Sequence, residues 1–301
     1  MESSLMENNA VHERMAETNT KNKKARGVIF MFKRTSLLCL AIWLSFSVLQ
    51  TGTLASMYSN KPIHWGFAKS KNHEPASAGK ELDELLAKYD SFYIGHTKEK
   101  HIYLTFDNGY ENGYTKKVLD VLKEKKVPAA FFVTGHYLKD QPELVKRMVK
   151  EGHIVGNHSW HHPDLTQVSD KRLKEELQKV KDEYKQLTGR DDMKYLRPPR
   201  GIFSERTLAL SKQEGYTTAF WSLAFVDWIT NQQKGWKYSY DNIMRQIHPG
   251  CILLLHTVSK DNAEALSQAI DDLRKQGYEF HSLDEYILNE AKVNPILFHP
   301  R

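Results

Sequence analysis

Short apolar runs alternate with helical patterns along most of this 301-residue chain, and this alternation restricts the fold more than any other feature of the sequence. Three helical patterns end at a glycine, namely Gly152, Gly215 and Gly277, and an apolar run follows each of them. Glycine readily adopts the left-handed conformation that terminates a helix. Strands that alternate with helices of this length form parallel β-α-β units. The predicted strands cover residues 101–106, 129–134, 153–157, 194–197, 217–223, 251–256 and 278–282, and the predicted helices cover 79–90, 114–125, 142–151, 169–187, 204–214, 240–247 and 262–276.

Seven strands of this kind favour a closed or nearly closed α/β barrel over an open sheet, and the sequence leaves closure undecided. We predict a distorted (β/α)7-8 barrel in a single domain with an N-terminal extension. In parallel α/β folds, functional residues gather at the carboxyl ends of the strands. The predicted segments are a polar N-terminus with a signal peptide or membrane anchor at 1–55, the extension at 56–98, the barrel domain at 99–290 and a tail at 291–301.

The N-terminal segment has the order of a secretory signal. Lys33 and Arg34 precede an apolar run at 37–49, and small residues follow it up to Ala55. The run is shorter than the roughly 20 apolar residues of a spanning helix, so cleavage after Ala55 is one outcome. Membrane association through residues 37–55, as an uncleaved anchor, is the alternative, and the sequence does not decide between the two. Both place the barrel domain outside the cytoplasm.

The charge and cysteine content narrow the range of partners. The net charge is +6, but the basic residues form no stripe of the kind that binds nucleic acid. A weakly basic exported protein suits an anionic matrix such as a cell wall. Cys39 and Cys251 both lie in apolar runs, which excludes a disulfide framework. We predict no nucleic-acid partner and no obligate protein partner.

Polar side chains follow five of the predicted strands. Because the carboxyl ends of parallel strands meet at one mouth of a barrel, we expect these side chains to lie close together. In chain order they are Asp107 and Asn108, the run His158-Ser159-Trp160-His161-His162, the run Arg197-Pro198-Pro199-Arg200, Asp227, and His256.

The histidine run is a candidate metal site. On a helical turn, the spacing of four places His158 and His162 on one face, where both imidazoles can bind one ion while His161 points away. Such pairs also arise by chance as exposed histidines. Their place after a strand, opposite Asp107, favours the metal site.

The remaining polar groups suit acid and base catalysis. Asp107 is either a turn-capping carboxylate or a general base, and a base needs a cation such as Arg197 to orient it and keep it ionised. A structural ion pair is the other interpretation of Arg197. His256 ends a fully buried apolar run and is either a core residue or, paired with Asp227, a proton donor.

Tryptophans near the predicted strand ends indicate a sugar ligand, because flat rings stack on sugar faces. Trp160, Trp228 and Trp236 are the candidates. We assign Trp221 to the core because it lies within a predicted strand.

Five motifs, taken in order, resemble those of the polysaccharide deacetylases with a NodB-homology domain, carbohydrate esterase family 4. The resemblance covers residues 100–287. The motifs are Thr105-Phe106-Asp107-Asn108-Gly109, His158-Ser159-Trp160-His161-His162, Arg197-Pro198-Pro199-Arg200, Asp227-Trp228 and Leu254-Leu255-His256.

The resemblance implies metal-dependent removal of an acetyl group from an N-acetylated sugar, on a distorted barrel. It implies a divalent cation, zinc or another first-row metal. By position, Asp107 would be the base that takes a proton from the attacking water, and Arg197 would orient it. His256 would protonate the departing amine, and Asp227 would tune the pKa of His256. The metal would be held by His158, His162 and Asn108, and the sugar would be contacted by Trp160, Trp228 and Leu254.

Two residues depart from the family pattern. Asn108 stands where the family usually has a second aspartate, and Arg200 stands where it usually has tyrosine. An amide oxygen is a weaker ligand than a carboxylate, so an inactive sugar-binding protein on the same scaffold is one alternative. Arg200 is a candidate partner for the lactyl carboxylate of muramic acid.

The run 107–113, Asp-Asn-Gly-Tyr-Glu-Asn-Gly, together with Trp65-Gly66-Phe67, resembles one branch of the family. That branch consists of the peptidoglycan N-acetylmuramic acid deacetylases of spore-forming bacilli, which act on the path to muramic δ-lactam in the spore cortex. The resemblance implies peptidoglycan glycan strands as the substrate and a location in the cell wall or spore envelope. Deacetylation of peptidoglycan N-acetylglucosamine or of chitin-like chains is the alternative activity.

Overall fold

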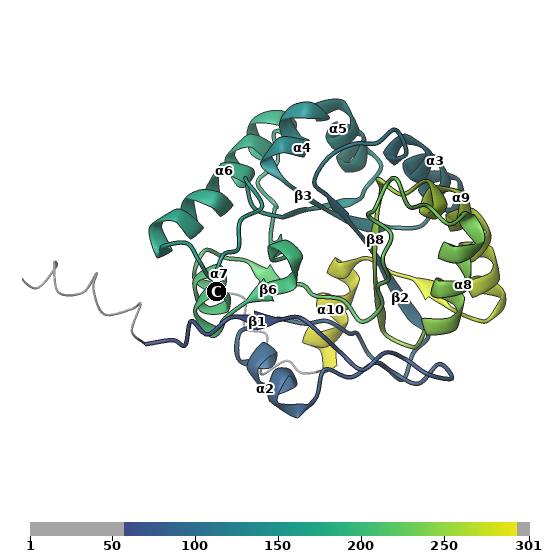
Figure 1. The fold of residues 1–301 in the computed structure, drawn as a ribbon, viewed down its shortest axis with the longest axis horizontal. Coiled ribbons are helices and arrows are strands. Elements are labelled where there is room, and N and C mark those ends of the chain that lie inside the picture. Colours follow the sequence, from purple (N-terminus) through teal and green to yellow (C-terminus); the bar gives the residue numbers. More distant parts are fainter. Residues whose placement is uncertain (1–56, 294–301) are drawn as a thin grey trace, which may run out of the picture. The chain divides into compact units, whose positions relative to one another are not determined.

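The computed structural model describes residues 57–293, so the predicted signal or anchor at 37–55 and residues 294–301 lie outside the described part (Figure 1). Within the described part, no helix combines the length and the apolar character that crossing a membrane requires. The predicted segment boundaries at residues 55, 98 and 290 stay predictions.

The core of the fold is a seven-stranded parallel sheet. The strand order places β2, which carries Asp107, between β3 and β8. Backbone hydrogen bonds on both sides therefore fix the position of Asp107 in the sheet. β9 pairs with the amino end of β2. The order is β7 (Thr217–Thr218), β5 (Tyr195–Leu196), β4 (Ile154–Asn157), β3 (Ala129–Val133), β2 (His101–Asn108) and β8 (Cys251–His256), with β9 (Glu279–Phe280) off this path.

The sheet curves into a half-barrel, and no continuous ladder joins β7 to β8 among the described residues. Single bridges link the two edges instead, one between Leu223 and Leu253 and two through the extension, where Phe92 pairs with Ala219 and Ile94 with Cys251. The predicted strand at 217–223 is therefore short, because its second half leaves β5 and binds the extension. The predicted α/β class and distorted barrel are confirmed.

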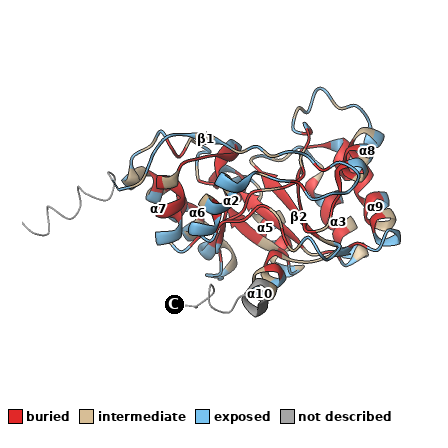
Figure 2. Cartoon of the chain, turned by 90° about the horizontal axis from the view of Figure 1, so that it is seen from below, coloured by how far each residue is buried: buried red, intermediate tan, exposed pale blue. Residues whose placement is uncertain are grey.

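Helices cover the outside of the sheet (Figure 1). Buried residues concentrate in the strands and on the helix faces turned toward them (Figure 2). Helix α9 illustrates the pattern, since its apolar residues recur at helical spacing and are buried. The helices are α2 (Lys80–Lys88), α3 (Thr115–Lys125), α4 (Gly135–Asp140), α5 (Pro142–Lys150), α6 (Asp170–Thr188), α7 (Glu205–Gln213), α8 (Trp236–Gln246), α9 (Lys260–Lys275) and α10 (Leu283–Val293).

The three glycines that were predicted to end helices do so. Gly152, Gly215 and Gly277 follow α5, α7 and α9 and have φ angles of 82°, 83° and 82°. A side chain in this left-handed region is unfavourable, which explains why glycine stands there.

A small antiparallel sheet escaped prediction because its two strands are only two residues long. It pairs β1 (Ile63–His64) of the extension with β6 (Ile202–Phe203). Next to it, the backbone N–H of Trp65 donates to the carbonyl of Gly201 at 2.9 Å, and its indole N–H donates to the carbonyl of Trp221 at 3.0 Å. The extension therefore holds the loop that carries Arg200.

Candidate active site

A cavity of about 1040 Å³ opens at the carboxyl ends of the strands. Most of the predicted site residues line it, although they come from five separate segments of the chain. Arg197, Asp227 and Asn108 lie behind the wall. The predicted residues in the wall are Asp107, His158, Trp160, His162, Arg200, Trp228, Leu254 and His256.

The carboxylate of Asp107 is bound by a fully buried arginine. Arg197 Nη1 donates to Asp107 Oδ1 at 2.9 Å and to Thr105 Oγ1 at 2.9 Å. The rest of the guanidinium donates to the carbonyls of Ala219 and Phe220 at 3.0 and 3.2 Å. Four of the five N–H groups of this side chain therefore donate to fixed partners in the barrel, and the guanidinium orients Asp107.

Burial and the neighbouring cationic groups set the pKa of Asp107. Burial on its own would raise the pKa of this carboxyl group, but Arg197, and after it His158 and His256, outweigh burial and hold the pKa below its ordinary value. Asp107 is therefore ionised at neutral pH. Its Oδ2 lies 3.6 Å from His158 Nε2.

The two histidines of the run meet, but not through the helical turn that their spacing suggested. Residues 158–162 form a loop in which Ser159 and His162 have φ angles of 64° and 58°. The backbone N–H of His162 donates to Ser159 Oγ at 3.0 Å, which closes the loop. The rings of His158 and His162 then lie 4.8 Å apart between centroids. His161, which was predicted to point away from the other two histidines, bonds through Nδ1 to Glu176 and also lines the cavity.

Both imidazoles are available as neutral ligands. Burial lowers the pKa of His158, and loss of solvation lowers the pKa of His162, whose side chain opens into the cavity. His158 Nδ1 donates to the carbonyl of Arg197 at 2.8 Å, which leaves Nε2 without a proton. Metal-binding histidines are commonly held in this way by a carbonyl.

Asn108 is fully buried behind the cavity wall, next to Asp107 in the chain. Its Nδ2 donates to Thr257 Oγ1 at 2.7 Å, and Thr257 in turn accepts from Thr115. Among the described residues, Asn108 Oδ1 has no hydrogen-bond partner. A buried oxygen without a partner is costly, and a cation would satisfy it. Two neutral imidazole nitrogens and one amide oxygen fit a divalent first-row metal.

His256 forms a second pair, next to Asp107, because the two residues are in register on the neighbouring strands β8 and β2. Its Nδ1 donates to Asp227 Oδ1 at 2.7 Å, and its backbone N–H donates to Asp227 Oδ2 at 2.8 Å. Burial on its own would lower the pKa of His256, but Asp227, followed by Asp107, outweighs burial and raises the pKa. Asn262, which sequence analysis missed, also donates to Asp227 and fixes this carboxylate.

Aromatic side chains form the rest of the wall. Trp160 packs tightly over Gly135, where any side chain would overlap its ring, and Lys139 Nζ lies 5.1 Å from its ring centroid. The ring of Trp228 lies 5.5 Å from that of His256 and is 48% exposed. Trp221 was assigned to the core, but it is half-buried and lines the cavity, because the chain leaves the sheet before it. The cavity wall does not include Trp236, which begins α8.

Comparison with known proteins agrees with this geometry. Residues 94–219 match the family model described as polysaccharide deacetylase. The chain is 57% identical over 262 residues to the peptidoglycan-N-acetylmuramic acid deacetylase PdaA of Bacillus subtilis, covering 87% of this chain and 98% of that protein.

Two solved structures are also similar. The structure of Bacillus subtilis PdaA, a family 4 carbohydrate esterase, matches with a TM-score of 0.76 and 61% identity over 77% of this chain and 99% of that chain. A family 4 carbohydrate esterase from Bacillus anthracis matches with a TM-score of 0.66 and 58% identity over 76% and 98% of the two chains. The protein therefore belongs to the polysaccharide deacetylase family, and it has the fold of the family 4 carbohydrate esterases.

Proposed function

We propose that this protein hydrolyses the N-acetyl group of N-acetylmuramic acid in peptidoglycan, a step towards muramic δ-lactam in the spore cortex. The observation that carries the proposal is a cavity in which an arginine-bound carboxylate and an aspartate-bound histidine lie side by side on neighbouring strands. The likeness to PdaA of Bacillus subtilis, whose name states this activity, supports the choice of sugar. Peptidoglycan lies outside the cytoplasm, so the protein acts in the cell wall or spore envelope.

Deacetylases of this family are in general metal-dependent. In this chain, His158, His162 and Asn108 Oδ1 would hold the ion, and we propose zinc or another first-row metal because imidazole suits these ions. A bound ion supplies polarisation of the acetyl carbonyl and charge stabilisation as the tetrahedral centre forms.

The protein side chains move the protons. Ionised Asp107 accepts a proton from the water that attacks the acetyl carbon. Arg197 keeps this carboxylate charged and aimed at the cavity. His256, whose pKa Asp227 raises, donates a proton from Nε2 to the departing amine nitrogen as the carbon–nitrogen bond breaks. Acetate and the free amino sugar result.

Arg200 is the group that distinguishes muramic acid. It lines the cavity, is exposed, and forms no ion pair with a described residue. Its planar guanidinium can bind a carboxylate through two parallel hydrogen bonds. The lactyl group of muramic acid carries such a carboxylate, and N-acetylglucosamine has none. Trp160, Trp228 and Leu254 provide the apolar surface for the sugar rings.

We expect Arg200→Tyr to lower the preference for muramic acid over glucosamine by roughly 10- to 100-fold, the value of one or two charge-assisted hydrogen bonds. Both side chains are equally disfavoured at the φ of 58° that this position adopts, so the backbone should not change. The measurement is kcat/KM on matched oligosaccharides that carry the acetyl group on one sugar or the other. Arg245→Tyr, an exposed position on α8 outside the cavity wall, is the control. An unchanged preference in Arg200→Tyr contradicts this assignment.

We expect Asp227→Asn to move the alkaline limb of the pH–kcat profile to lower pH. In the parent protein the pKa of His256 is raised, so the imidazolium persists above its ordinary range and activity is lost only as the pH passes that raised value. Without Asp227, burial dominates and the pKa falls. Asp241→Asn, whose aspartate pairs with Lys237 on the outside of α8, should leave the profile unchanged. If the alkaline limb of the Asp227→Asn profile stays at the same pH, Asp227 does not raise the pKa of His256.

The deciding experiment is mass spectrometry of defined muropeptides after incubation with the full-length protein. Loss of one acetyl group from muramic acid, abolished by a chelator and restored by zinc, is the expected result. Loss from glucosamine supports the alternative substrate. Binding of the glycan with no loss of mass, under metal-saturated conditions, supports an inactive scaffold.

A further inference from the structure

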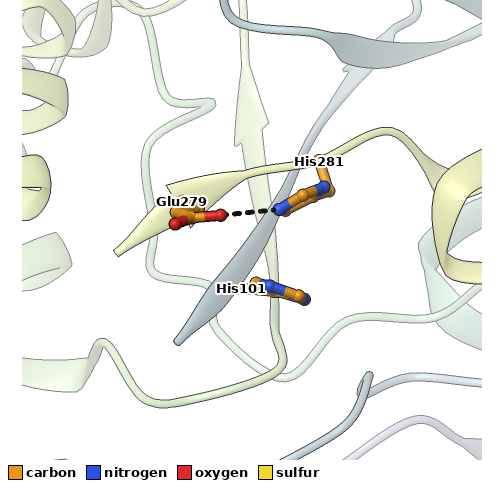
Figure 3. A group of neighbouring side chains, drawn as sticks. All are labelled: His101, Glu279 and His281. Atoms are coloured by element: carbon orange, nitrogen blue, oxygen red, sulfur yellow. Dashed lines mark hydrogen bonds and ion pairs between the residues drawn. The ribbon is translucent and has the colours of Figure 1, made fainter. Parts of the chain in front are cut away.

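A second group of metal-binding side chains lies at the opposite end of β2 from Asp107. It comprises His101, Glu279 and His281 (Figure 3). His101 is the first residue of β2 and pairs in register with Glu279 of β9, and His281 follows two residues later. Because side chains alternate along a strand, Glu279 and His281 project to the same side. The local register therefore brings the three together.

The distances suit a single ion. One potential ligand atom from each side chain lies within 4.8 Å of the others. His281 Nε2 and Glu279 Oε2 are 3.4 Å apart. In a tetrahedral zinc site with bonds of about 2.1 Å, two ligand atoms are about 3.4 Å apart. Two of the three ligands therefore already have the separation that a zinc ion requires, and a ligand atom of His101 lies within 4.8 Å of both.

Two further carboxylates stand behind the histidines. His281 Nδ1 lies 3.6 Å from Glu285 Oε1, and His101 Nδ1 lies 3.2 Å from Glu99 Oε2. Zinc-binding histidines commonly donate their second ring N–H to a carboxylate, which orients the ring and makes the other nitrogen a better ligand. Each histidine here has a carboxylate within 4 Å of its Nδ1, close enough for that contact to form when Nε2 binds an ion.

The charge around the group attracts a cation. The two histidines are surrounded by the carboxylates of Glu99, Glu279 and Glu285. The nearby lysine and arginine side chains form hydrogen bonds with other groups. Lys100 Nζ donates to the carbonyl of Gln276, and Arg274 Nη2 donates to that of Lys125. The side chain of Glu279 is 73% exposed and that of His281 is 23% exposed, so an ion can enter from solvent.

We propose that His101, Glu279 and His281 form a second metal site, which binds zinc and joins β9 and the start of α10 to β2. Two imidazoles and one carboxylate select zinc over magnesium and calcium, which take mainly oxygen ligands. The site lies six residues along β2 from Asp107, roughly 20 Å at about 3.3 Å per residue. Its ion is therefore separate from the ion of the cavity, and the inference does not depend on the proposed function.

Zinc binding to the metal-free full-length chain tests the proposal, measured by equilibrium dialysis. The parent is the variant His158→Ala/His162→Ala, in which the cavity histidines are gone. This parent should bind one equivalent of zinc, and zinc should raise its melting temperature. Adding Glu279→Gln/His281→Gln should abolish both effects. Adding His64→Gln, an exposed histidine on β1, should change neither.

Two results would overturn the site. One is a parent variant that binds no zinc, and the other is zinc binding that survives Glu279→Gln/His281→Gln. Because the side chain of Glu279 is largely exposed, the single variant Glu279→Gln should fold like the parent and shows weakened zinc binding if the proposal holds. Unchanged affinity in that folded variant would exclude Glu279 as a ligand.

Discussion

Replacing Asp107 with asparagine is expected to lower kcat of muropeptide deacetylation by about 10²- to 10⁴-fold, the usual contribution of a general base. The carboxylate is the group in the cavity that is both ionised at neutral pH and held in one orientation, by Arg197. An asparagine of the same shape can still accept from Arg197 but cannot take a proton from water. KM should change much less than kcat, because the interaction is needed in the transition state.

Two measurements separate loss of the base from loss of the site. Zinc bound in the cavity should remain in Asp107→Asn, because His158 and His162 are unchanged. Asp192→Asn provides a matched control, since Asp192 also pairs with an arginine, Arg190, but lies outside the cavity wall. Turnover of a folded, zinc-loaded Asp107→Asn protein at the parent rate would refute the assignment of Asp107 as the base.

The repeating part of the fold is readable from the sequence because it follows from local rules. Apolar strands, amphipathic helices and glycine at helix ends each leave a signal within a few residues. Parallel strands then bring their carboxyl ends together, and so Asp107 and His256, 149 residues apart in the chain, are paired neighbours on β2 and β8. No knowledge of side-chain packing is needed for that step.

Other features depend on contacts that no local pattern records. The bridges from Phe92 and Ile94 to the two edges of the sheet connect segments far apart in the sequence. The approach of His158 to His162 relies on two non-glycine residues with left-handed backbone, a conformation that the residue types do not announce. Asn262 is the third residue of α9 and looks like an ordinary helix residue until its contact with Asp227 is seen.

Asn108 is partly predictable from the local sequence and partly dependent on contacts distant in the chain. Its position after Asp107 marks it as part of the site, but its role depends on the two ends of one amide. The nitrogen donates to Thr257, and the oxygen has no hydrogen-bond partner in the part of the chain that the structure describes. An aspartate at 108 would offer a stronger ligand and lose the donor to Thr257. With asparagine, Thr257 Oγ1 accepts from the amide, whereas an aspartate would have to accept from the Thr257 hydroxyl instead.

The largest loss of stability is expected from Arg197→Met, about 3–5 kcal/mol, because it leaves the Asp107 charge buried and unpaired. The carbonyls of Ala219 and Phe220 also lose their donor. The measurement is urea unfolding of full-length protein at neutral pH, with Arg245→Met on the surface of α8 as the control. A loss below 1 kcal/mol would show that the pair is not the buried ion pair described here.

The dependence of this loss on pH identifies its cause. In the parent, the lowered pKa of Asp107 contributes stability above the unfolded-state pKa, and this contribution disappears as the pH falls through the folded-state pKa. In Arg197→Met, burial is no longer outweighed and raises the folded-state pKa of Asp107. The contribution of Asp107 to the unfolding free energy then increases as the pH falls, because protonation removes the buried charge. The difference in unfolding free energy between parent and variant should therefore shrink between pH 7 and pH 5.

The double variant Arg197→Met/Asp107→Asn should be more stable than Arg197→Met at neutral pH, because it contains no unpaired buried charge. If the double variant is the less stable of the two, the lost hydrogen bonds to the barrel carbonyls, and not the charge of Asp107, are the reason that Arg197 is needed.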